Sequence, residues 1–216
     1  MNNLIHVYGG SPKKHGSLEE YFFKLTESLK ENGWKTTFVF GRIPEEHLLG
    51  KYEKVGGKIV ILPSTSRRVD CHLIYSFYKL FKKEKVDVVN CHFGRTGFNA
   101  MVAAWLAGVP AKIWTKHSLE YSAYKGMEVP YVKRRWFSLL KLEALLSNAV
   151  IAVSDAVKQE LINEYYINKH KIFQIFLGIN NSRFHGVDGS YLKKEFSLSD
   201  GKIVITCLSQ ARPEKG

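Results

Sequence analysis

The stretches that decide the fold are Ala-Val-Ile-Ala-Val at residues 149–153 and Val-Asp-Val-Val-Asn at residues 86–90. Both runs are short and rich in β-branched residues, and neither shows the strict alternation of a half-buried strand. This composition is typical of a parallel strand that helices cover on both faces. The two segments are therefore predicted to be inner strands of a parallel sheet.

Similar runs recur along the chain, with longer helical patterns between them. Further strands are predicted at residues 4–8, 35–40, 58–62, 111–114, 171–176 and 202–207, and further helices at about 70–84, 96–107, 131–147, 155–164 and 189–196. A first helix is expected to begin at Ser17, in a capping box with Glu20, and to end at Gly33. This alternation predicts an α/β fold: an open, doubly wound, Rossmann-like parallel sheet with helices on both faces.

The composition describes a folded protein. Of 216 residues, 45% are hydrophobic and 24% charged, which excludes disordered and fibrous classes. The formal net charge of +12 favours anionic partners such as nucleic acid, anionic lipid or phosphorylated substrates. No apolar run reaches the roughly 18 residues of a spanning helix, and no signal peptide is recognisable. We expect a cytoplasmic location, with a peripheral position on the inner face of the membrane as an option.

The loop after the first predicted strand contains Gly9 and Gly10 and leads through Gly16 and Ser17 into a helix. In an open parallel sheet, ligands bind outside the carboxyl ends of the strands. Backbone N–H groups beside a helix N-terminus suit phosphate or sugar hydroxyls, although a plain tight turn explains the two glycines equally well. The residues alone leave these two interpretations open.

Two histidines follow later predicted strands at the same edge, His92 after residues 86–91 and His117 after residues 111–114. Such a histidine can hydrogen-bond a hydroxyl or phosphate, transfer a proton near neutral pH, or be an ordinary loop residue. No metal site is expected, because Cys91 and His92 are adjacent and no carboxylate completes a ligand set. The three cysteines show no C-x-x-C spacing and are expected to be reduced and mostly buried.

The segment 125–141 is basic and contains aromatic and aliphatic residues between its charges. Two interpretations remain open for it. It is either an ordinary amphipathic helix that packs on the sheet, or a helix that lies on an anionic membrane surface. Nucleic acid is not expected as a partner, because no basic and aromatic cluster matches a known nucleic-acid module.

Four stretches, taken in order, resemble the amino-terminal half of the family-four retaining glycosyltransferases, which have the two-domain GT-B architecture. They are Gly16-Ser17-Leu18-Glu19, Leu106 to Pro110 with the following strand that ends in His117, Ala149 to Ala156, and Leu177 to Phe184. The resemblance implies a Rossmann-like acceptor-binding domain over residues 1–186. It also implies that residues 187–216 begin a truncated donor-binding domain.

The last residues resemble the segment that opens the family's second domain. Lys215 matches the lysine that contacts donor phosphates in the family. Gln210 stands where the family has a phosphate-binding arginine, and Arg212 would supply that contact from a neighbouring position. Without the rest of that domain, the strand at residues 202–207 would lack its neighbours. An unpaired strand is a template for pairing, so self-association through this strand is expected, with a flexible tail as the alternative.

The resemblance implies an enzyme of polysaccharide biosynthesis, a hexosyltransferase that moves a sugar from a nucleotide-sugar donor to a glycan or lipid-linked acceptor with retention of configuration. His117 would be catalytic, and the acceptor would be bordered by Gly9, Gly10, Gly16, Ser17 and His92. No cofactor is implied, and the 216-residue chain by itself is expected to be inactive. The competing hypothesis is a non-catalytic Rossmann-like module that binds a nucleotide, a polyanion or a partner protein.

Overall fold

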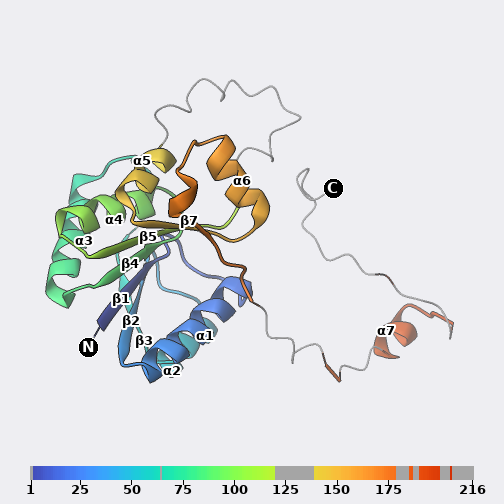
Figure 1. Ribbon diagram of the computed structural model, residues 1–216. Coiled ribbons are helices and arrows are strands. Elements are labelled where there is room, and N and C mark those ends of the chain that lie inside the picture. Colours follow the sequence, from blue (N-terminus) through green and yellow to red (C-terminus); the bar gives the residue numbers. More distant parts are fainter. Residues whose placement is uncertain are drawn as a thin grey trace. The chain divides into compact units, whose positions relative to one another are not determined.

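Within the described residues, seven parallel strands form one sheet in the order β3-β2-β1-β4-β5-β6-β7 (Figure 1). The strands are β1 (Asn2–Val7), β2 (Trp34–Phe40), β3 (Gly57–Ile61), β4 (Val88–Cys91), β5 (Ala111–Lys116), β6 (Ala149–Ala152) and β7 (Ile172–Gln174). The first strand thus lies inside the sheet, between β2 and β4. The predicted doubly wound parallel sheet is confirmed.

The computed structural model describes residues 2–63, 65–119, 139–178, 185–186, 190–199 and 205. The chain divides into two units, Met1–Gly178 and Ile179–Gly216. The larger unit contains the whole sheet, and the helix α7 (Ser190–Glu195) belongs to the smaller one. The domain boundary expected at residue 186 stays a prediction.

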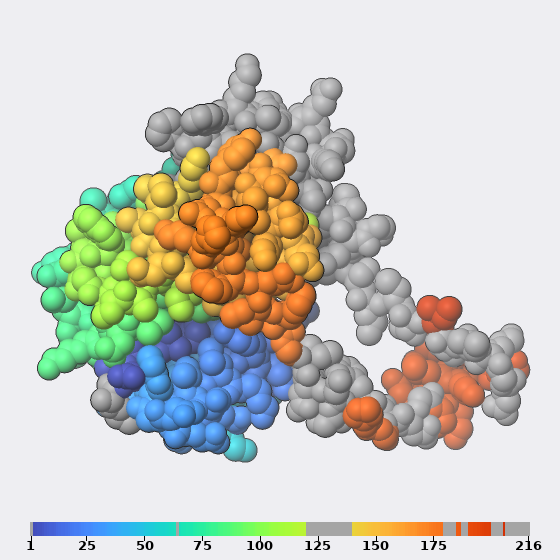
Figure 2. Space-filling view, viewed as in Figure 1, coloured from blue at the N-terminus to red at the C-terminus, as the bar shows by residue number. Residues whose placement is uncertain are grey.

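Helices cover both faces of the sheet. Packed on one face are α1 (Ser17–Glu31) and α2 (Glu46–Lys54), and on the other are α3 (Cys71–Glu84), α4 (Gly94–Leu106), α5 (Leu139–Leu146) and α6 (Asp155–Asn163). Figure 2 shows the blue segments that include α1 on the opposite side of the unit from the green and orange helices. A short 3₁₀ turn, Lys169–Lys171, leads into β7.

Each helical layer has its own core. Between the sheet and α1 and α2, the core is aromatic and includes the fully buried Phe22, Phe38 and Tyr52. The other core is larger and mostly aliphatic, with Val89 of β4 and Val150 of β6 completely buried. Each such side chain contributes about 1.5–3 kcal/mol by leaving water, so the two cores hold the sheet between its helices.

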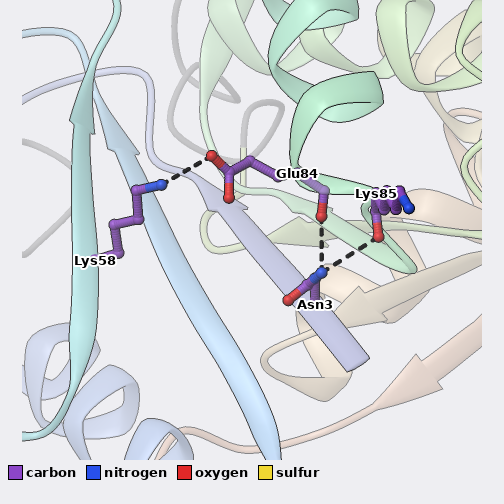
Figure 3. A network of polar contacts seen from close by, with 4 residues as sticks. All are labelled: Asn3, Lys58, Glu84 and Lys85. Atoms are coloured by element: carbon purple, nitrogen blue, oxygen red, sulfur yellow. Dashed lines mark hydrogen bonds and ion pairs between the residues drawn. The ribbon is translucent and has the colours of Figure 1, made fainter. Parts of the chain in front are cut away.

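The amino-terminal end of the sheet is held by a small polar network (Figure 3). Asn3 Nδ2 donates to the carbonyl oxygens of Glu84 at 2.7 Å and of Lys85 at 3.4 Å, and Lys58 Nζ contacts Glu84 Oε1 at 2.8 Å. Hydrogen bonding to Lys58 lowers the pKa of Glu84. These contacts tie the end of α3 to β1 and β3.

The switch in strand order lies between β1 and β4. The chain leaves β1 toward β2 on one side, and it leaves β4 toward β5 on the other. The helices that follow these two strands, α1 and α4, therefore lie on opposite faces of the sheet. Their divergence opens the carboxyl edge at this point, where doubly wound folds bind ligands.

Three local expectations differ from the structure. The helix α2 was not predicted, because its buried residues are only Leu48 and Tyr52 among charged neighbours. Helix α1 is capped by Gly16, whose N–H donates to Glu19 Oε2 at 2.9 Å, so the expected Ser17–Glu20 capping box was wrong by one residue. Of the two described cysteines, Cys91 is buried as expected, whereas Cys71 at the start of α3 is exposed; Cys207 lies outside the described residues.

Two predicted segments fall largely outside the described residues. They are the first part of the helix expected at 131–147, of which the structure describes Leu139–Leu146, and the strand expected at 202–207. Among the described helices, none combines the length and the apolar character that a bilayer span requires.

Candidate active site

Three histidines lie on neighbouring strands at the carboxyl edge of the sheet. His6 belongs to β1, His92 directly follows β4, and His117 directly follows β5. The backbone N–H of His92 donates to Val7 O at 3.0 Å, which continues the β1–β4 pairing by one residue. The parallel register of the three strands therefore brings the three imidazoles together.

The imidazoles form a chain of two hydrogen bonds. His6 Nδ1 lies 2.9 Å from His92 Nε2, and His92 Nδ1 lies 3.0 Å from His117 Nε2. Each distance is that of a nitrogen–nitrogen hydrogen bond in which one ring donates and the other accepts. Both ring nitrogens of His92 are thus hydrogen-bonded to other histidines, and neither is left to bind a ligand.

Aromatic side chains enclose the inner two rings. His6 stacks on Phe38, with ring centroids 5.3 Å apart and planes 12° apart, and its centroid lies 4.9 Å from that of Phe22. Phe22 also meets His92 edge-on, at 5.0 Å. His6 and His92 are 1% and 3% exposed, so helix α1 and strand β2 seal this end of the chain from water.

Burial keeps all three rings neutral at physiological pH. It lowers the pKa of His6 to about 3. The pKa of His92 is held well below its ordinary value by burial and, to a lesser extent, by repulsion from its two imidazole neighbours. The pKa of His117 is lowered to about 4 by burial and by the neighbouring Lys116 ammonium. Each ring therefore carries one proton, and the positions of these protons depend on the hydrogen bonds.

A cavity of about 410 Å³ opens at the same edge, between the ends of β1 and β4. It is lined by Tyr8, Gly9, Gly10, Thr65, Phe93, Gly94, Arg95 and Thr96. Phe93 connects it to the histidine chain, because its ring stacks on His117 with centroids 4.7 Å apart. The outer histidine is therefore adjacent to the rim of the cavity, although it does not line the wall.

Gly9 and Gly10 both line this cavity. Gly9 also has a structural reason to be glycine. Its φ is +77°, and an added Cβ would lie 2.9 Å from Phe93 O and 3.1 Å from Thr96 Cβ. The loop after β1 therefore approaches the start of α4 more closely than any side chain permits.

The other predicted site residues are placed differently. Gly16 and Ser17 do not line the described cavity, and the N–H of Gly16 is already used by Glu19. His92 was expected to contact the acceptor, but it is buried and both its nitrogens bind other histidines. Arg212 and Lys215, the expected donor-phosphate contacts, lie outside the described residues.

Sequence reasoning missed His6 and the aromatic residues around it. A signal was present, since His6 is a titratable side chain in the middle of an apolar strand. Such a residue needs a polar partner when it is buried. Its partner is 86 positions away, and only the sheet order brings the two together.

The described residues contain no group of three or more histidine, cysteine or carboxylate side chains arranged to hold a metal ion. The three histidines are joined in a row by nitrogen–nitrogen contacts, so their nitrogens do not converge on one point. Their arrangement suits hydrogen bonding and proton placement.

Residues 18–183 match the model of the family described as Glycosyltransferase Family 4. The chain belongs to glycosyltransferase family 4. This match covers β2 to β7 and includes two of the three histidines of the site, His92 and His117. The family predicted from four short stretches of sequence is thereby confirmed.

A curated relative supports the family assignment. The chain is 30% identical over 148 residues to an Escherichia coli enzyme, UDP-Gal:alpha-D-GlcNAc-diphosphoundecaprenol alpha-1,3-galactosyltransferase. The match covers 68% of this family-four chain and 38% of that enzyme. The chain thus corresponds to less than half the length of this relative.

Solved structures share the fold. A glycosyltransferase from Rickettsia africae superposes with a TM-score of 0.61 at 20% identity, covering 93% of this chain and 50% of that one. Anabaena HepE, solved in complex with UDP and glucose, gives a TM-score of 0.60 at 11% identity, covering 89% of this chain and 50% of that one. The family-four chain therefore has the fold of an amino-terminal, Rossmann-like GT-B domain.

Proposed function

We propose that this chain is the acceptor-side part of a retaining hexosyltransferase. It would act on a nucleotide-sugar donor and a glycan or lipid-linked acceptor in polysaccharide biosynthesis. Membership of family 4 supports the reaction class. The name of the Escherichia coli relative gives UDP-Gal as donor and a diphosphoundecaprenol-linked sugar as acceptor, which supports substrates of these two classes here.

The observation that carries the proposal is the position of His117. Its Nε2 is bound to His92, and no hydrogen bond connects its Nδ1 to the described residues. A neutral imidazole held in this way can hydrogen-bond an oxygen of the transferred sugar or of the leaving phosphate. Glycosyl transfer depends on placing two substrates and on stabilising the leaving diphosphate, so one well-placed polar contact is valuable there.

The cavity beside Phe93 is the proposed acceptor site. Its wall includes the start of α4, where the N-cap residue Phe93 provides no side-chain cap and the first turn holds no acidic residue. Arg95 of the same turn adds a cation. Uncapped N–H groups and a guanidinium favour an acceptor that carries phosphate.

Two further parts of the proposal concern regions that lie largely outside the described residues. Residues 187–216 would begin the donor-binding domain, with Arg212 and Lys215 near the donor phosphates. The basic segment 125–141 would bring the protein to an anionic membrane surface on the cytoplasmic side, where a lipid-linked acceptor is found. Because the chain matches 38% of the Escherichia coli enzyme, the 216-residue chain alone is proposed to be inactive.

A transfer assay tests the proposed function. The protein is incubated with UDP-galactose, UDP-glucose or UDP-N-acetylglucosamine and with a lipid-diphosphate-linked N-acetylglucosamine. Because the 216-residue chain is proposed to be inactive alone, a separately produced donor-binding domain from a family-four enzyme is added in parallel. Transfer with an α-linked product supports the proposal, and a β-linked product contradicts retention. Binding of nucleotide without transfer in any combination would favour the non-catalytic module instead.

A further inference from the structure

His6 is a buried histidine that the proposed reaction does not use directly. It is 1% exposed, and it reaches neither the cavity nor, in any described contact, His117. Its Nδ1 nevertheless lies 2.9 Å from His92, which in turn is 3.0 Å from His117. The hydrogen-bonded path from the His6 ring to His117 therefore passes through the central ring.

The protons of this chain have two self-consistent arrangements. A neutral imidazole carries one N–H, and each of the two contacts needs one donor and one acceptor. In the outward arrangement every ring is protonated on Nδ1, so His6 donates to His92, and His92 donates to His117. In the inward arrangement every ring is protonated on Nε2, and both hydrogen bonds are reversed.

The inner end of the chain distinguishes the two arrangements. His6 Nε2 is buried and has no hydrogen-bond partner. The inward arrangement would place a proton there, and a buried N–H would be left without an acceptor. The outward arrangement leaves only a bare ring nitrogen. Among backbone groups, buried N–H donors without partners are rarer than carbonyl acceptors that lack a donor, and the same preference applied to the ring nitrogen favours the outward arrangement.

We propose that His6 and His92 are positioning residues that hold His117 as the neutral Nδ1–H tautomer, so that it meets its substrate as a hydrogen-bond donor. This inference rests on the proposed function, in which His117 faces the substrate. The packing of the three rings supports it. Phe22 and Phe38 fix the inner ring, and Phe93 stacks on His117 at 4.7 Å, so the ring planes as well as the protons are held.

Nitrogen NMR of the chain labelled with ¹⁵N-histidine tests the proton arrangement directly. A free histidine side chain in water prefers the Nε2–H tautomer, whereas the proposal requires the Nδ1–H tautomer, so the two cases can be told apart. We expect Nδ1–H signals for His6, His92 and His117, and scalar couplings across both nitrogen–nitrogen hydrogen bonds. An Nε2–H signal for His117, or the absence of the His92–His117 coupling, overturns the proposal.

Two matched variants test whether His6 sets the direction of the chain. In His6→Met the sulfur can accept a hydrogen bond from His92 but cannot donate one, so His117 is expected to change to Nε2–H. In His6→Gln the amide can donate to His92, and His117 is expected to stay Nδ1–H. A packing role alone predicts the same His117 tautomer in both variants, and that result overturns the role of His6. Lys58→Met, at the far end of the sheet, is the control and should leave all three ring signals unchanged.

If His6→Met does not fold, the wild-type spectrum still decides the proton arrangement. In the transfer assay, folded His6→Met is expected to lower kcat about tenfold with little change in the KM of the acceptor. A wild-type kcat in a variant whose His117 tautomer has changed would refute the link between tautomer and turnover. Because the spectra require no substrate, a failed transfer assay contradicts the proposed function without affecting this test.

Discussion

His6 Nδ1 and His92 Nε2 lie 2.9 Å apart inside the protein, although 86 positions separate the two residues in the sequence. Both rings are buried, and neither has an acidic partner in the described contacts. The pair extends to His117 at the rim of the candidate site. A line of neutral imidazoles thus connects the aromatic core beneath α1 to the edge where family-four substrates are proposed to bind.

Acid is expected to destabilise the protein through these histidines. In the unfolded chain a histidine binds a proton below about pH 6.5, whereas burial lowers the pKa of His6 to about 3 and of His117 to about 4 in the folded chain. The unfolded state therefore binds more protons between these values, so stability falls as the pH falls from about 7 toward 4. Each such group contributes a slope of about 1.4 kcal/mol per pH unit below about pH 6.

Urea unfolding between pH 7 and pH 4.5 measures this slope. His6→Phe should reduce it by about the contribution of one histidine, whereas Phe77→Leu, in the other core, should lower stability by a similar amount at every pH. If the free energy of unfolding of His6→Phe changes with pH as steeply as that of the wild type, the His6 ring is not the source of the acid sensitivity.

Replacing the outer histidine should affect turnover more than folding. In the transfer assay with the added donor-binding domain, His117→Ala is expected to lower kcat at least tenfold, since the loss of one polar contact at the transition state costs about 1.4 kcal/mol or more. The side chain is partly exposed and stacks on Phe93, so the thermal midpoint should change by only a few degrees. Steady-state kinetics and thermal unfolding give both values. Turnover equal to that of the wild type would remove His117 from the reaction.

Gly9→Ala should destabilise the protein by about 1–3 kcal/mol. The φ of +77° is unfavourable for alanine, and the new Cβ would lie 2.9 Å from Phe93 O. Gly10→Ala is the matched control, because the nearest atom to its added Cβ is Tyr8 Cε1 at 3.4 Å. Chemical denaturation of both variants checks the difference. Equal losses would mean that the close approach to α4 does not constrain the loop.

Arg95→Gln is expected to weaken binding of a phosphate-bearing acceptor. Arg95 lines the cavity, and its guanidinium donates to Ser66 O, which holds the side chain at the wall. Loss of one charge-assisted contact should raise the KM of the acceptor about tenfold and leave kcat within about threefold. In the transfer assay with the added donor-binding domain, a lipid-diphosphate acceptor should show this increase, and an acceptor without phosphate should not. A similar increase for both acceptors would argue against a phosphate contact.

The sequence by itself determined the sheet and the family. The short apolar run Ala149–Val153 identified a strand of the parallel sheet, although only one of its faces is fully buried, since Val150 and Ala152 are buried whereas Ala149 and Ile151 are half-buried. The helix Glu46–Lys54 could not be predicted in the same way, since only Leu48 and Tyr52 of that helix are buried. Its stability comes from packing against the aromatic core, which is a tertiary contact.

Only the tertiary structure decided the composition of the site. The sequence placed His92 and His117 at the ligand edge because each follows a strand, but it gave no information on which neighbours their nitrogens bind. That depends on the strand order β1-β4-β5, which places His6 beside His92. Burial of the rings then lowers their pKa values and requires them to bind one another. His6 and His92 are 86 positions apart in the sequence, and His92 and His117 are 25 positions apart. Hydrogen bonds over such separations leave no periodic signal in a sequence, so the histidine chain became visible only in the fold.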